Sequence, residues 1–299
     1  MIVKWTESEI PSQENRTAIV TGANAGIGFE TARILAEKEG HVILACRNQA
    51  RGEGAVERIL TKTPGLSVEL EILDLSSLTS VEKFAKRMES KLSSLDLLVN
   101  NAGVMIPPES KTEDGFELQF GVNYLGHFAL TGHLLPLLQK SEQARVVTLS
   151  SIAHRTGSVN FDSFRGGTRY RAWKSYEQSK LACLMFALEL DQRLRARGIN
   201  VSSLAAHPGG TKTDLQRHNR FFDWATDKVA MRANQGALPT LYAATSAKAE
   251  GGTYYGPNGF MEMRGYPALA KVSKRARDQE VRKRLWEVSS ELSRVEYLR

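Results

Sequence analysis

Short apolar segments alternate with longer amphipathic segments along most of the chain. The apolar segments are mostly rich in Val, Ile and Leu, and the stretches between them, such as SVEKFAKRMESKL, have helical periodicity. Short, nearly continuous apolar strands that alternate with helices are typical of a parallel sheet covered on both faces. The pattern therefore predicts one doubly wound α/β domain over residues 1–299. The expected strands are 17–21, 41–45, 67–73, 95–100, 145–150 and 200–206.

Composition excludes several classes of protein. With 41% hydrophobic and 24% charged residues the chain lies in the ordinary globular range. Its two cysteines, Cys46 and Cys183, have neither CxxC spacing nor a neighbouring His cluster, so we predict no disulfide and no metal site. Residues 1–16 contain no apolar stretch long enough for a signal peptide, and no run is long enough to span a bilayer. We expect a cytoplasmic protein without an integral membrane anchor.

The formal net charge of +7 is concentrated at the C-terminal end of the chain. Residues 271–299 hold nine Lys or Arg against five Asp or Glu. The same segment predicts a helix over about 271–296, packed on its own body or on a second subunit. A membrane or nucleic-acid surface is the alternative, but no stacking aromatics or reading motif accompany the charges, so we expect no nucleic-acid partner. The apolar stripe of this helix consists of Val281, Leu285, Val288, Leu292 and Val295.

The region 211–231 differs from the rest of the chain. It is polar, basic and aromatic, and it shows no clear strand pattern. Because a long segment after the carboxyl end of a strand is where such folds build substrate loops, we predict a substrate loop here that closes over the active site.

Three glycines, Gly22, Gly26 and Gly28, stand where the strand 17–21 becomes a helix. Such a turn brings free backbone N–H groups and the positive end of the helix dipole to one point, which creates an anion site. A Cβ would block the tight turn or the approach of a phosphate. A purely structural glycine turn is the alternative, but the position after the first strand of a parallel pattern favours phosphate binding.

The end of the second strand bears on which dinucleotide would bind. An acidic residue at this position would bind the ribose hydroxyls of NAD, whereas the sequence ILACRN places Arg47 there. A guanidinium pairs with a 2′-phosphate, so NADP(H) is favoured over NAD(H). The alternative is that Arg47 is an ordinary surface arginine, and Ala25 in the glycine turn offers no second basic contact.

Tyr176 and Lys180 lie four residues apart, on one face of a predicted helix. A lysine ammonium near a phenol favours the phenolate, which would let Tyr176 exchange a proton with a carbonyl oxygen. Ser150 and Ser151 follow a predicted strand at the edge where open α/β sheets bind ligands. These four residues predict an active site at that edge.

The order of the motifs resembles that of the short-chain dehydrogenase/reductases. TGANAGIG, the Asp of LDL, NNAG, the Asn of GVNYLGH, TLSS, YEQSK and HPGGTKT follow one another as they do in that family, and the likeness covers about residues 15–260. ACRN, NYLGHF and LSSIAH are similar to the retinol dehydrogenase and WW-domain oxidoreductase branch. The resemblance implies a Rossmann-type fold and an oxidoreductase.

The same resemblance implies roles for individual residues. Tyr176 would be the general acid/base, and Lys180 would assist it while binding the nicotinamide ribose. Ser151 would hydrogen-bond the substrate oxygen, although Ser150 could point inward in its place. Asn123 would hold a water in a proton relay to Lys180, or simply kink its helix. The implied cofactor-binding residues are Gly22, Asn24, Gly26, Ile27, Gly28, Arg47, Asp74, Leu75, Asn101, Ala102, Gly103, Tyr176, Lys180, Pro208, Gly209, Thr211 and Thr213.

The sequence as a whole predicts an NADP(H)-dependent oxidoreductase that interconverts an apolar aldehyde or ketone and its alcohol. Two alternatives stay open: a catalytically silent NADP(H)-sensing or scaffold protein on the same fold, and an NAD-dependent alcohol dehydrogenase. The complete set of Asn123, Ser151, Tyr176 and Lys180 argues against the silent protein. Related proteins commonly form dimers through helices of the YEQSKLACLMF type, which leaves a homodimer open.

Overall fold

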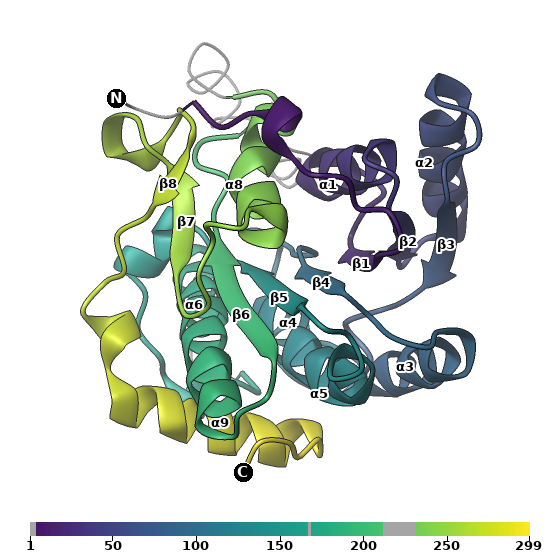
Figure 1. Ribbon diagram of the computed structural model, residues 1–299. Coiled ribbons are helices and arrows are strands. Elements are labelled where there is room, and N and C mark those ends of the chain that lie inside the picture. The colour runs from purple at the N-terminus through teal and green to yellow at the C-terminus, as the bar shows by residue number, and fades with distance from the viewer. Residues whose placement is uncertain (1–3, 167–168, 212–230) are drawn as a thin grey trace.

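Eight strands of the described residues form one sheet in which every neighbouring pair except β7 and β8 is parallel. The computed structural model describes residues 4–166, 169–211 and 231–299. The strand order is β3-β2-β1-β4-β5-β6-β7-β8, and Figure 1 shows the sheet with helices on both sides. The strands are β1 (Thr17–Thr21), β2 (His41–Cys46), β3 (Val68–Ile72), β4 (Leu97–Asn100), β5 (Ala144–Leu149), β6 (Val201–Ala206), β7 (Tyr254–Pro257) and β8 (Pro267–Leu269).

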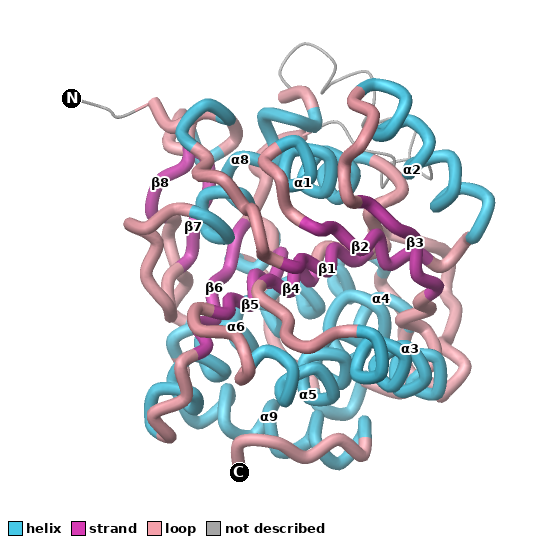
Figure 2. The backbone as a smooth tube through the Cα atoms, turned by 45° about the vertical axis from the view of Figure 1, so that its right-hand side comes forward, coloured by secondary structure: helices cyan, strands magenta, loops and turns pink. Residues whose placement is uncertain are grey.

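Helices cover the two faces of this sheet as separate layers (Figure 2). One layer contains α1 (Gly26–Glu37), α2 (Gln49–Lys62) and α8 (Ala233–Thr245), with α1 packed against α8. The other layer contains α3 (Leu78–Lys91), α4 (Leu118–Phe120), a π-helical turn η2 (Gly121–Leu125), α5 (Gly126–Leu138), α6 (Ala172–Ala196) and α9 (Gln279–Ser293). Short 3-10 turns are η1 (Glu7–Glu9), η3 (Ile152–Arg155), η4 (Phe161–Ser163), η6 (Phe260–Glu262) and η7 (Arg275–Arg277).

The predicted doubly wound α/β fold is confirmed, with one correction to the sheet. All six expected strands form within a few residues of their predicted bounds, and both faces of the sheet are packed in apolar cores. The sequence pattern did not predict β7 or β8, and β8 runs antiparallel to its neighbour. A parallel neighbour requires a long crossover connection, whereas the short segment between β7 and β8 lets the chain turn back directly. None of the described helices is long and apolar enough to cross a lipid bilayer.

The C-terminal helix α9 is shorter than the predicted 271–296. It begins after Asp278, whose side chain accepts a hydrogen bond from the Val281 N–H at 3.1 Å, and it ends at Arg294, which has a left-handed backbone (φ 57°). An acidic N-cap satisfies the first free N–H groups of a helix, and a left-handed residue stops it. The residues before Asp278 form the separate turn η7.

The apolar stripe of α9 packs on the protein's own body. Trp286 is buried and lies 5.0 Å from Phe128 of α5 and 6.0 Å from Phe186 of α6, measured between ring centroids. The buried Tyr124 hydroxyl lies 2.7 Å from the Ser289 hydroxyl. The helix therefore covers faces of α5 and α6. The sequence alone did not show whether this helix or a second subunit would cover them.

Truncation of Trp286 tests how much this cover contributes to stability. We expect Trp286→Ala to lower the free energy of unfolding by about 3–5 kcal/mol, because the removed ring leaves a cavity among buried aromatic side chains. The change is measured by urea denaturation at equilibrium. Lys283→Ala, on an exposed position of the same helix, is the control and should change stability by less than about 0.5 kcal/mol. Equal effects of the two substitutions would contradict the packing role.

Candidate active site

The glycine turn after β1 has the geometry that its sequence predicts. Gly22 (φ 65°) and Gly26 (φ 57°) adopt left-handed backbone conformations that favour glycine. A Cβ on Gly28 would lie 2.6 Å from the Gly22 carbonyl oxygen and would overlap the Asn101 side-chain amide. The N-cap of α1 is Ala25, whose side chain cannot accept a hydrogen bond from the first helical N–H groups. The turn thus leaves donors available for an anion and room for it to approach.

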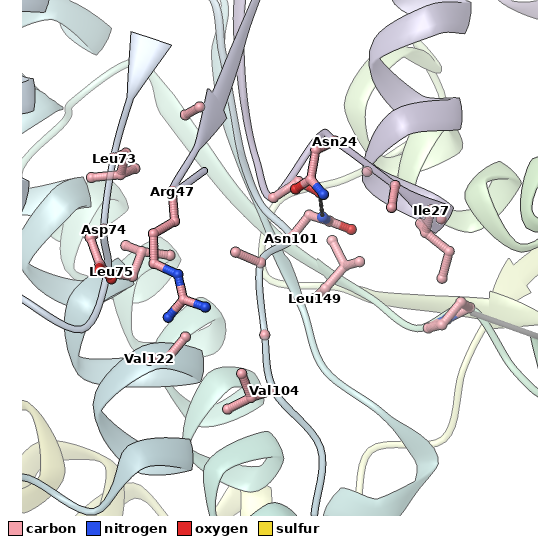
Figure 3. Close-up of a pocket in the computed structure, with 18 of the residues that line it drawn as sticks. Asn24, Ile27, Arg47, Leu73, Asp74, Leu75, Asn101, Val104, Val122 and Leu149 are labelled. Carbon is pink, nitrogen blue, oxygen red and sulfur yellow. Dashed lines mark hydrogen bonds between the residues drawn. The ribbon is translucent and has the colours of Figure 1, made fainter. Parts of the chain in front are cut away.

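A cavity of ≈ 310 Å³ opens beside this turn. Arg47, Asp74 and Leu75 lie on one side of it, and Asn24, Ile27 and Asn101 on the other (Figure 3). Gly209 and Thr211 lie outside its lining, and Thr213 falls in the segment 212–230, outside the described residues, as does nearly all of the predicted substrate loop. The predicted cofactor residues that line it are Gly22, Asn24, Gly26, Ile27, Gly28, Arg47, Asp74, Leu75, Asn101, Ala102, Gly103, Tyr176, Lys180 and Pro208.

The Thr21 hydroxyl at the end of β1 joins the glycine turn to the segment after β4. Its oxygen accepts hydrogen bonds from the backbone N–H groups of Asn101 and Ala102, both at 2.9 Å. The Asn101 side chain in turn donates to the Thr21 carbonyl at 2.7 Å. These bonds fix the NNAG segment against the floor of the cavity.

His127 extends this network to the π-helical turn η2. Its Nδ1 lies 2.9 Å from the Asn123 carbonyl oxygen, which can only accept, so Nδ1 carries the proton. Its Nε2, 2.9 Å from the Thr21 hydroxyl, is then the acceptor. Complete burial lowers the pKa of His127 to about 4; the hydrogen bond to Asn123 opposes this lowering, and the Lys180 charge adds a smaller contribution to it. His127 is therefore neutral near pH 7 and serves as a polar link.

Tyr176 and Lys180 project from the first turns of α6 into the cavity. Both are buried, and the Lys180 ammonium lies 5.9 Å from the centroid of the Tyr176 ring. Lys180 Nζ donates a hydrogen bond to the Leu149 carbonyl at the end of β5, at 3.1 Å. This bond holds the ammonium at the carboxyl edge of the sheet while leaving its other N–H groups available.

The two serines after β5 have different environments. Ser150 lines the cavity, but its hydroxyl donates to the Lys180 carbonyl of α6 at 2.7 Å. The Ser151 hydroxyl oxygen caps η3 by accepting the Ala153 N–H at 3.2 Å, so its own proton stays available to another acceptor. Ser150 is therefore committed to the fold, whereas Ser151 keeps a free donor.

Asn123 is buried in η2 and uses its side chain to join two segments. Its Oδ1 accepts the Val104 N–H at 2.7 Å, and its Nδ2 donates to the Val104 carbonyl at 3.0 Å and to the Ser179 hydroxyl at 2.9 Å. The side chain thus holds the chain after NNAG against α6. The described residues contain no group of three or more His, Cys, Asp or Glu side chains placed to hold a metal ion.

A glycine turn, an adjacent cavity and a Tyr–Lys pair on one helix place this chain beside a known family. The family model described as short chain dehydrogenase matches residues 16–222. The chain belongs to the short-chain dehydrogenases. It is accordingly an oxidoreductase of the class that acts on alcohols and carbonyl compounds.

Relatives with curated names point to one branch of the short-chain dehydrogenases. Human retinol dehydrogenase 11 is 40% identical over 280 residues, covering 93% of this chain and 85% of that protein. Mouse polyprenol dehydrogenase is 41% identical over 291 residues, covering 93% of this chain and 83% of that protein. The predicted retinol dehydrogenase-like branch is therefore confirmed.

Solved structures agree with this family assignment. The crystal structure of an uncharacterised protein from Mycobacterium paratuberculosis is 41% identical with a TM-score of 0.83, and the match covers 98% of this chain and 99% of that one. A short chain dehydrogenase from Shigella flexneri, solved in complex with NADP, is 25% identical with a TM-score of 0.67 and covers 82% of this chain and 98% of its own.

The structure adds one basic residue that the sequence analysis missed. Arg51, in the first turn of α2, lines the cavity together with Arg47. Arg51 stands four residues after Arg47, and residues four apart share a face within a helix. Arg47 precedes α2, however, so the sequence did not show whether the two side chains would point to the same cavity.

The two cysteines are both buried and free, and the reactivity of their thiols tests this burial. Burial raises the pKa of Cys46 to about 11 and also raises that of Cys183, so both remain thiols well above neutral pH. Since the thiolate is the reactive form, we expect no reaction of the folded protein with a disulfide reagent at about pH 8. The unfolded protein in guanidinium chloride is the control and should react at both thiols. Rapid reaction of the folded enzyme would contradict the burial of these side chains.

Proposed function

We propose that the protein is an NADP(H)-dependent oxidoreductase that interconverts an apolar aldehyde or ketone and its alcohol. The observation that carries the proposal is that Tyr176 and Lys180 line the same cavity as the glycine turn. This arrangement supports proton exchange and pyrophosphate binding at one site. A cytoplasmic location stays the expectation from the sequence.

The residues around the cavity fit a phosphorylated dinucleotide. Gly22, Gly26 and Gly28 line the cavity with their backbone, which supports a close approach of the pyrophosphate to the glycine turn. Arg47 and Arg51 lie beyond the end of β2, where a carboxylate would favour NAD, and two guanidinium groups there favour a 2′-phosphate. The NADP complex of the relative from Shigella flexneri supports the same choice.

In the proposed reaction the protein positions the substrate oxygen and moves its proton. A bound nicotinamide cofactor would supply or accept the hydride. Tyr176 would donate the proton to the carbonyl oxygen during reduction, and the Ser151 hydroxyl would donate a hydrogen bond to the same oxygen. The Lys180 ammonium favours the phenolate left on Tyr176. Asn123 would maintain the position of α6 through Ser179.

An apolar substrate is supported by two observations. The relatives named above act, by their names, on retinol and polyprenol, which are apolar alcohols. In this chain Trp173 is 42% exposed and its ring centroid lies 5.9 Å from that of Tyr176. A large exposed aromatic ring beside the proton donor fits an apolar substrate.

Removal of the Tyr176 hydroxyl tests the mechanism. We expect Tyr176→Phe to lower kcat for NADPH-dependent reduction of apolar aldehydes by at least about 100-fold, because the general acid is lost. NADPH affinity, measured by fluorescence titration, should stay within about twofold, since the ring is kept. Tyr242→Phe, a partly buried tyrosine packed on Trp5 and remote from the cavity lining, is the matched control. Retained turnover in Tyr176→Phe would refute the assignment of the acid.

Removal of the two guanidinium groups tests the cofactor choice. We expect Arg47→Ala and Arg51→Ala each to raise the Kd for NADPH about tenfold and to leave the Kd for NADH unchanged, because only the 2′-phosphate is lost as a partner. Arg197→Ala, at an exposed position after α6, is the control. Equal effects on NADPH and NADH would show that neither arginine distinguishes the two cofactors.

A further inference from the structure

The turn between β7 and β8, residues 258–266, has an unusual backbone. Met261 (φ 52°) and Glu262 (φ 60°) both occupy the left-handed region, which non-glycine residues rarely adopt. Such strain persists where the surroundings hold the chain in place, and it is concentrated at functional sites. The turn lies at the sheet edge formed by β7 and β8 (Figure 1).

Glu262 is the residue that holds this turn. Its Oε2 lies 2.9 Å from His207 Nε2 and 2.6 Å from an Arg155 guanidinium nitrogen. Its Oε1 accepts the Lys271 N–H at 3.1 Å. Partial burial opposes ionisation of Glu262, but the contacts with His207, Lys271 and Arg155 outweigh it and hold its pKa below the ordinary value. The carboxylate is therefore charged near neutral pH and bridges two other segments of the chain.

Through His207 the bridge reaches the segment after β6. His207 is completely buried, and its Nδ1 accepts the Gly209 N–H at 3.2 Å, so the proton is on Nε2 and is donated to Glu262. Burial keeps the pKa of His207 below its usual value, which is consistent with a neutral ring. The next residue, Pro208, lines the cavity. A backbone bond from Gly210 N–H to the Met263 carbonyl, 2.8 Å, reinforces the contact.

Through Arg155 the same carboxylate reaches the segment after β5. Arg155 ends η3, the turn that Ser151 caps, and the neighbouring His154 Nδ1 lies 2.7 Å from the Ser151 carbonyl oxygen. Glu262 thus joins the strained turn to the segment that carries Ser151 and to the segment that lines the cavity at Pro208.

The side chains that flank this anchor are apolar and exposed. Phe260 is 83% and Met261 is 64% exposed. Two neighbouring large apolar side chains that are exposed on a strained turn mark a candidate contact with an apolar ligand. Because the turn is fixed to both segments that border the proposed reaction site, a substrate that extends beyond that site is the ligand it fits.

We propose that the β7–β8 turn recognises the apolar part of a long carbonyl or alcohol substrate, with Glu262 as a positioning residue and Phe260 and Met261 as specificity-determining residues. The inference rests on the proposed function and adds to it the element that selects substrate length. The reaction chemistry stays with Tyr176 and Ser151, so substitutions in the turn should affect KM for long substrates more than kcat.

Specificity is tested with the double variant Phe260→Ser, Met261→Ser. With NADPH, we expect KM for decanal to rise about tenfold while KM for butanal and both kcat values change less than about twofold. Leu269→Ser, which removes a 72% exposed apolar side chain from the adjacent strand β8, is the matched control and should leave both aldehydes unaffected. An unchanged ratio of kcat/KM between decanal and butanal in the double variant would overturn the proposal.

The anchor is tested separately with Glu262→Ala. We expect backbone amides of residues 259–263 to exchange hydrogen about tenfold faster, and the decanal preference to fall as it does in the double variant. Glu262→Gln, which keeps an acceptor for the Lys271 N–H, should restore part of the protection, and Glu89→Ala, an exposed carboxylate on α3, should change neither readout. Unchanged exchange, or faster exchange with an intact decanal preference, would overturn the positioning role.

The two levels of the inference fail in different ways. A wild-type protein that reduces neither aldehyde with NADPH contradicts the proposed function and the substrate role of the turn together. A wild-type protein that reduces both, combined with an unchanged length preference in the variants, contradicts the role of the turn alone.

A membrane contact of the turn is tested by measuring how the wild type and the double variant bind to lipid vesicles. If the double variant loses vesicle binding but keeps the length preference, the proposal is overturned.

Discussion

One buried hydroxyl joins the segments that form the cavity beside the glycine turn. Thr21 accepts the N–H groups of Asn101 and Ala102 and lies against His127, which bonds in turn to the Asn123 carbonyl. Valine at position 21 would fill a similar volume but would leave the Ala102 N–H without its acceptor, whereas the Asn101 N–H also donates to the Val99 carbonyl at 3.0 Å. An unsatisfied buried donor costs roughly 1–3 kcal/mol. The close packing of Gly28 against Asn101 leaves no freedom to move these groups elsewhere. The cavity therefore depends on a few polar contacts made by strand ends.

Those parts of the structure that depend on local chemistry could be predicted from the sequence. The strands β1, β2, β4, β5 and β6 are buried on both faces, so continuous apolar runs specify them. Gly22 and Gly26 adopt left-handed backbone angles, and glycine is the residue type that favours them, so the tight turn could be predicted. Tyr176 and Lys180 share a face because of helical spacing alone, and the structure brings both to the cavity edge.

Features that depend on distant partners could not be predicted. The segments of β7 and β8 are short and contain Gly or Pro, and they become strands only by pairing with β6 and with each other. The end of α9 falls at Arg294 because of a left-handed turn, although the apolar pattern continues to Val295. Glu262 lies far along the chain from both Arg155 and His207, so no local pattern relates these residues.

The glycine turn and the β7–β8 turn differ in how the sequence specifies them, and this difference bears on the proposed selection of substrates. The glycine turn depends on backbone conformation and close packing: a Cβ on Gly22 would lie 2.9 Å from the Ala102 Cα, and a Cβ on Gly28 would lie 2.6 Å from the Gly22 carbonyl oxygen. The β7–β8 turn is instead held by the Glu262 carboxylate and by the backbone bond from Gly210 to Met263, and its Phe260 and Met261 side chains are mostly exposed. Substitution of exposed side chains has little effect on stability, whereas a side chain at Gly22 or Gly28 would require neighbouring atoms to shift. On the proposed roles, variation in the turn would therefore alter which substrates fit while the cavity beside the glycine turn and the fold stay the same.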